Sequence, residues 1–157
     1  MKDYEIIVDE FIVNWAVDKN SFAYSMDEIS TLEAQIDVRF PDSYRYLVSK
    51  YHKVYCPHLL NAIVAGEHQM HDLQNLMSPS EFEENIHVNE DFGLPVEFVA
   101  FGNDCMGNLF CFKTDELVES AERNAKIWFF DHDFSTISEE ANTFSDFIER
   151  FNLIKNA

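Results

Sequence analysis

The chain has 157 residues, a length that suits one domain, and 46% of them are hydrophobic and 15% aromatic. This composition supplies a substantial core and excludes a disordered chain, which would be poor in large apolar side chains. The 29 acidic residues outnumber the 11 basic ones and give a net charge of −18. Such a surface repels nucleic acid and anionic membranes and favours a cationic partner, although acidity can also serve solubility alone.

Three cysteines, Cys56, Cys105 and Cys111, are an odd number without repeated spacing, so they do not indicate a disulfide framework. Free thiols fit a reducing cytosol. The N-terminal segment lacks the basic and long apolar regions of a signal peptide, and no stretch reaches the roughly 20 apolar residues of a membrane span. We therefore expect a soluble protein of the cytoplasm.

Helical spacing of apolar residues predicts a first helix that ends near Val17. A second helix is expected to begin at a capping box of Ser25 and Glu28. Pro41 interrupts this helix and suits the first turn of a third one. The three apolar faces consist of Tyr4, Ile7, Val8, Phe11 and Trp15, then Ile29, Leu32 and Ile36, then Tyr44, Leu47, Val48 and Tyr51.

The middle of the chain is harder to assign. The short apolar run 59–65 predicts a strand that Gly66 closes, although such runs are ambiguous between strand and helix. Residues 70–85 are expected to be helical or irregular, with a helix start at Ser78.

The second half turns toward β structure. Residues 96–101 and 109–112 predict two strands of a hairpin around the turn 102–108, and the aromatic run 126–131 predicts a strand buried on both faces. Thr143 and Asp146 can cap a last helix. Helices first, strands next and one helix last indicate an α+β fold with a mainly antiparallel sheet.

Several residues could carry chemistry, and each has a simpler interpretation. His68 and His71 precede Asp72 at a spacing that could bind a metal, but no third or fourth ligand is evident, and surface histidines explain them as well. The sequence has no phosphate-binding loop and no calcium loop. We expect no metal and no other cofactor.

Cysteine and histidine could also form a catalytic pair. Cys56 and His58 flank a proline and are too close in the chain to aim at one substrate, whereas His132 is well separated from Cys105 and Cys111. Free cysteine is usually a small buried hydrophobe, which favours a structural role. His132 between Asp131 and Asp133 could serve acid–base work, but a strand end that reaches solvent explains this triplet more simply. We expect that the protein is not an enzyme.

The order of motifs resembles the SUKH superfamily, the Smi/Knr-type domains, over about residues 25–152. The resemblance lies in Ile29 to Glu33 followed by Phe40-Pro41-Asp42, in the hairpin 98–112, in the strand 127–132 and in the closing helix from Thr143 to Ile148. Phe40 stands where the family usually has Leu, and residues 51–55 replace its usual Asn-Gly turn. The expected organisation is a single SUKH-like domain spanning 1–157, with an N-terminal helix before the matched region.

The resemblance implies a helix-flanked antiparallel sheet and a role in binding other proteins. Many bacterial members look like immunity proteins that neutralise a cognate toxin of polymorphic or contact-dependent growth inhibition systems, often a nuclease, in the cytosol. A nuclease has a basic working surface, which suits an acidic partner. The alternative is a regulatory or scaffold module of the same fold. The residues that we expect at a toxin interface are Asp104, Asp131, Asp133, Glu139 and Glu140.

Overall fold

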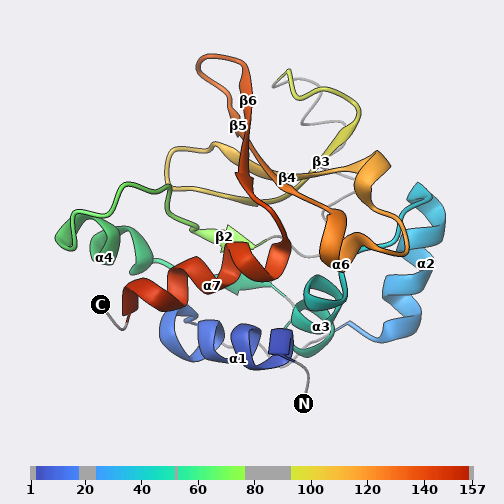
Figure 1. Cartoon of the computed structure of the whole chain (residues 1–157), viewed down its shortest axis with the longest axis horizontal. Helices are drawn as coiled ribbons and strands as arrows, with labels where there is room; N and C mark the ends of the chain where they lie inside the picture. Colours follow the sequence, from blue (N-terminus) through green and yellow to red (C-terminus); the bar gives the residue numbers. More distant parts are fainter. Residues whose placement is uncertain (1–2, 18–23, 52, 77–92, 156–157) are drawn as a thin grey trace.

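The computed structural model describes residues 3–17, 24–51, 53–76 and 93–155, which form one antiparallel sheet and a set of helices (Figure 1). The sheet has the strand order β1-β2-β3-β4-β5-β6, so every strand pairs with its neighbours in sequence. The expected α+β fold with a mainly antiparallel sheet is confirmed. The strands are β1 (Val54–Tyr55), β2 (Asn75–Leu76), β3 (Phe98–Asn103), β4 (Leu109–Lys113), β5 (Ile127–Asp131) and β6 (Thr136–Ala141).

Three helices precede the sheet, as the periodicity predicts. They are α1 (Asp3–Trp15), α2 (Met26–Ile36) and α3 (Asp42–Tyr51). The predicted capping box is present, because the Ser25 side chain accepts from the Glu28 backbone N–H and the Glu28 carboxylate accepts from the Ser25 backbone N–H. Helix α3 starts directly after Pro41, as expected. Its first turn is hydrogen-bonded to a residue far along the chain, since the Glu122 carboxylate accepts from the backbone N–H and the hydroxyl of Ser43.

The run 59–65 is a helix, and our strand prediction for it is wrong. In α4 (Leu59–Ala65) only Leu59 and Ile63 are buried, while Val64 is exposed. The buried pair lies four residues apart, which is the spacing of one helical face. Residues 70–74 are irregular and lead into β2, whereas the predicted helix start at Ser78 lies outside the described residues.

The predicted hairpin of the second half is confirmed with shifted ends. Strand β3 begins at Phe98 rather than at residue 96 and ends at Asn103 rather than at residue 101, and β4 pairs with it in antiparallel register. Gly102 lies so close to β2 that a Cβ atom there would meet the carbonyl oxygen of Asn75 at 2.9 Å. Glycine at this position therefore lets β2 pair with β3.

Strand β6 was not predicted. It pairs with β5 over the register from Asp131↔Thr136 to Ile127↔Ala141 and forms one edge of the sheet. The 3-10 turn Thr114–Glu116 and the short helix α6 (Ala121–Asn124), both between β4 and β5, were also missed. The chain then closes with α7 (Phe144–Lys155), where the predicted cap is present because the Thr143 hydroxyl accepts from the backbone N–H of Asp146.

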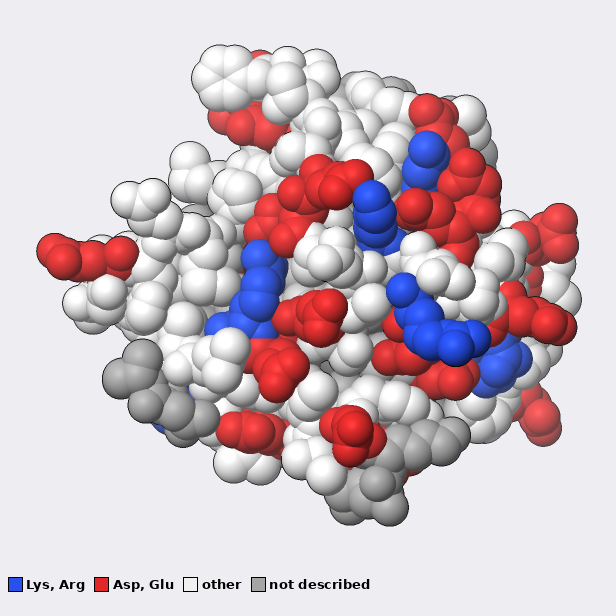
Figure 2. Space-filling view, viewed as in Figure 1, with Lys and Arg blue, Asp and Glu red and all other residues white. Residues whose placement is uncertain are grey.

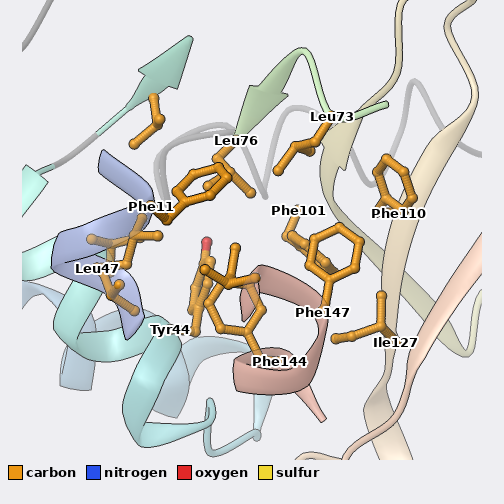
Figure 3. Close-up of a cluster of buried hydrophobic side chains, with 14 of the residues drawn as sticks. Phe11, Tyr44, Leu47, Leu73, Leu76, Phe101, Phe110, Ile127, Phe144 and Phe147 are labelled. Atoms are coloured by element: carbon orange, nitrogen blue, oxygen red, sulfur yellow. The ribbon is translucent and has the colours of Figure 1, made fainter. Parts of the chain in front are cut away.

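Aromatic side chains fill the space between the sheet and the helices (Figure 3). Tyr44 of α3 packs against Phe101, Phe112 and Phe144, with ring centroids 5.4 to 6.2 Å apart. A second buried cluster lies on the opposite face of the sheet and contains Leu94, Ala100, Leu109, Cys111 and Phe130. Burial of β5 on both faces is confirmed, because Phe129 belongs to the first cluster and Phe130 to the second.

Helix α1 is joined to this core through α7. The indole N–H of Trp15 donates to the carbonyl oxygen of Phe151 at 3.0 Å, and the amide of Asn152 donates to the carbonyl oxygen of Ile7 at 3.0 Å. Val8, Phe11 and Ile12 are buried beside them. The N-terminal helix is therefore part of the packed structure.

Candidate functional site

Two turns at one end of the sheet are connected by hydrogen bonds. The β3–β4 turn spans 104–108, and the β5–β6 turn follows Asp131 through residue 135. The side-chain oxygen of Asn108 lies 3.2 Å from the backbone nitrogen of His132 and 2.8 Å from its ring Nδ1. Gly107 has φ +83°, and a Cβ atom built there would lie 3.5 Å from Cε1 of the same ring. We call residues 104–108 and 131–135 together the tip surface.

Asp104 organises the first turn from inside. It is only 4% exposed, and its Oδ1 accepts hydrogen bonds from the backbone N–H groups of Met106 and Asn108, both at 2.9 Å. Its Oδ2 accepts from the Asn108 amide at 3.1 Å. The carboxylate that we expected at an interface is thus used within its own turn. It holds Met106 outward, where that side chain is 68% exposed.

Asp131 plays the same part in the second turn. Its Oδ1 accepts from the backbone N–H of Asp133 at 3.0 Å and of Phe134 at 3.3 Å. The carboxylate of Asp133 points to solvent and lies 3.4 Å from Nε2 of His132. Phe134 follows it with 78% of its surface exposed. The hairpin of β5 and β6 projects beyond the helices at the top of Figure 1.

Glu139 and Glu140 are consecutive residues of β6 and have different surroundings. Glu139 is exposed on the edge strand, where the Lys126 ammonium donates to its carboxylate at 2.7 Å. This hydrogen bond raises the pKa of Lys126. Glu140 has a side chain only 9% exposed, 3.2 Å from Nη1 of Arg150 and 3.3 Å from Nδ1 of His71. Of the five residues expected at an interface, Asp133 and Glu139 are thus exposed to solvent, whereas the carboxylates of Asp104, Asp131 and Glu140 bond to neighbouring groups of the chain.

Of the two histidines expected as possible metal ligands, His68 and His71, the second is engaged in a ring contact. The ring of His71 stacks on Phe129 with centroids 3.7 Å apart and planes at 4°. Asp72 is buried, and its carboxylate accepts from the backbone N–H of Cys105. Among the described residues, no group of three or more His, Cys, Asp or Glu side chains is placed to hold a metal ion.

The three thiols are held in the protonated form. Burial raises the pKa of Cys56 to about 12 and that of Cys111 still further. Cys105 is exposed, but desolvation and its contact with Asp72 raise its pKa to about 11. Both ring nitrogens of His132 face oxygen atoms, of Asn108 and Asp133, so the imidazole is not directed at a sulfur atom. The surroundings of these three thiols therefore do not stabilise a thiolate nucleophile.

Sequence reasoning missed the two exposed apolar side chains of the tip surface. Phe134 looks like core in a chain rich in buried phenylalanine, and Met106 looks like filling in a turn. The available signal was the polar run from Asp131 to Ser135, because an aromatic residue between turn formers has little core to enter.

An antiparallel sheet flanked by helices, with polar turns at one end, defines an α+β domain, and this architecture is consistent with a SUKH-like fold. Comparison with known families matches residues 24–150 to the SMI1 / KNR4 family (SUKH-1), close to the expected range of 25–152, and the chain belongs to that family. SUKH domains are generally binding modules and include immunity proteins, which bind toxin proteins. No curated protein matches the chain. In the part of the chain that the structure describes, no helix is both long and apolar enough to cross a bilayer.

Proposed function

We propose that this protein is an immunity protein of the cytoplasm that binds and neutralises a cognate toxin of a polymorphic or contact-dependent growth inhibition system. The observation that carries the proposal is a net charge of −18 on a SUKH-1 domain. The toxin that fits this charge is a nuclease domain with a basic working surface, because such a surface must attract polyanionic nucleic acid.

The charge is spread over the surface and is only partly neutralised by ion pairs. Figure 2 shows carboxylates over much of the visible face and fewer Lys and Arg side chains, most of which lie next to acidic ones. The projecting hairpin at the top of that view carries red and white atoms but no blue. An unbalanced field of this kind speeds the encounter with a cationic protein and disfavours anionic competitors.

The carboxylates proposed to meet the toxin are Asp131, Asp133 and Glu139. Asp133 and Glu139 have side chains mostly open to solvent, and Asp131 holds the turn that carries Asp133. Asp104 and Glu140 contribute by positioning: the first shapes the β3–β4 turn, and the second fixes β6 to α7 through Arg150. In this role the protein neutralises by occupying a surface and catalyses nothing.

Growth rescue tests the proposal. The product of the neighbouring gene, taken as the candidate toxin domain, is expressed from an inducible promoter, with and without the chain. Rescue together with a complex on a sizing column is expected. Failure of both would contradict an immunity function and would favour a regulatory module with a host partner. A toxin from an unrelated system serves as the specificity control and should not be neutralised.

A further inference from the structure

The tip surface presents two large apolar side chains that nothing in the described structure covers. Phe134 is 78% exposed, whereas every other phenylalanine among the described residues is buried or partly buried. Met106, on the neighbouring turn, is 68% exposed. Exposing both side chains to water costs hydrophobic free energy in the free protein. A partner that covers them would recover this free energy.

The backbone beneath these side chains is held in place. The carboxylate of Asp131 accepts from the N–H of Phe134, and Ser135 adopts a left-handed conformation at φ 53° before β6 begins. The Asn108–His132 contact ties this turn to the one that carries Met106. A preformed backbone lowers the entropic cost of binding, and phenylalanine has only two side-chain torsions to fix.

The charge around the apolar pair selects the partner. Residues 104–108 and 131–135 contain Asp104, Asp131 and Asp133 but neither Lys nor Arg. A second copy of this chain would bring two such acidic rims together and be repelled. A basic protein surface with an apolar pocket offers both complementary charge and a place for the ring.

We propose that Phe134 and Met106 form the apolar centre of the toxin interface, inserted in a pocket that Lys and Arg side chains of the toxin surround. Asp133 lies at the rim of this interface and meets one of those cations. The inference rests on the proposed function and names the surface that performs it. Phe134 determines the lifetime of the complex, and the carboxylates determine its rate of formation.

Alanine variants of the full chain test this interface with the adjacently encoded toxin domain, rendered inactive, as the probe. F134A is expected to weaken the equilibrium affinity about 30-fold or more, chiefly through faster dissociation, and M106A about fivefold. The matched controls are V13A and L153A, which truncate side chains 73% and 63% exposed on α1 and α7. Both should bind within twofold of the unchanged protein. D133N should slow association at low salt.

The outcomes separate the inference from the function. Unchanged affinity in F134A and in the double variant F134A/M106A would overturn the tip interface and leave the immunity function standing. Absence of any complex with the unchanged protein would overturn both. A sizing column of the chain alone completes the test, because a dimer that F134A abolishes would show that a second copy covers Phe134.

Discussion

The amide oxygen of Asn108 lies within hydrogen-bond distance of both the backbone nitrogen and the ring Nδ1 of His132, at 3.2 and 2.8 Å. These two residues stand 24 positions apart in the chain and close the gap between the hairpins β3–β4 and β5–β6. The Asn108 amide also donates to Asp104. A single side chain thus fixes both turns of the tip surface.

Removing this amide should loosen both turns together. Asn108→Ala is expected to lower the free energy of unfolding by about 1–2 kcal/mol, because it leaves the His132 N–H and the buried Asp104 carboxylate short of a partner. Urea unfolding measures the loss, and amide hydrogen exchange should accelerate in 104–108 and 132–135. The control Asn61→Ala lies on the exposed face of α4 and should change stability by less than about 0.5 kcal/mol. Acceleration in only one turn would contradict the coupling.

Helix α1 lies outside the residues matched to the family, yet we expect it to be essential for stability. Trp15→Ala should cost about 3–5 kcal/mol, because it leaves a cavity between α1 and α7. Trp15→Phe keeps an aromatic ring but loses the N–H to Phe151 and part of the indole volume, so a smaller loss of about 1–3 kcal/mol is expected. Thermal unfolding measures both. Val13→Ala on the same helix is the exposed control, and an equal loss there would contradict this role of Trp15.

Thiol chemistry should be slow in the folded protein. The raised pKa values of Cys56, at about 12, and Cys105, at about 11, keep both thiols protonated at pH 8. With an aromatic disulfide reagent at that pH, we expect slow reaction of one thiol, Cys105, and full reaction of three in urea. Cys105→Ser should remove the native reaction. Rapid reaction of any thiol would indicate an activated cysteine and revive an enzymatic interpretation.

The contact between α1 and α3 should make the free energy of unfolding fall as pH rises through the alkaline range. The Tyr51 hydroxyl donates to the Asp9 carboxylate, and burial together with this bond raises the pKa of Tyr51 from 10.0 to about 12. The unfolded chain therefore loses this proton first, so the stability that it contributes is complete below about pH 10 and is lost as pH rises toward 12. Tyr51→Phe should flatten this part of the profile in urea unfolding.

The same variant carries its own control. Near pH 7 the phenol is protonated in both states, so the difference between Tyr51→Phe and the unchanged protein there measures only the hydrogen bond, about 1–2 kcal/mol. A difference between the two proteins that stays constant from pH 9 to 12 would show that Tyr51 titrates alike in the folded and unfolded chains.

The helices of the first third could be predicted because local signals agree there. Ser25 and Glu28 form the cap that their spacing requires, and Pro41 marks the start of α3. The run 59–65 failed because hydrophobicity alone does not distinguish a strand from a short helix of which only Leu59 and Ile63 face the core. Tertiary packing decides such a segment.

The edge strand β6 could not be recognised from composition. Its sequence of Thr, Ile, Ser, two Glu and Ala is polar, as suits a strand that only one neighbour covers. The site was predictable only in part for a similar reason. Asp133 and Glu139 do face solvent, but the sequence could not show that Asp104 bonds its own turn or that Glu140 faces Arg150. Both depend on contacts that form only in the folded chain.

Binding between the purified chain and the adjacently encoded toxin domain, measured by titration calorimetry over a series of salt concentrations, tests the central claim most directly. We expect a one-to-one complex whose dissociation constant lies near or below about 10 nM and weakens several-fold as salt rises from low to physiological concentration, because acidic and basic surfaces meet. No measurable heat at any salt concentration, or equal affinity for an unrelated basic protein, would contradict it.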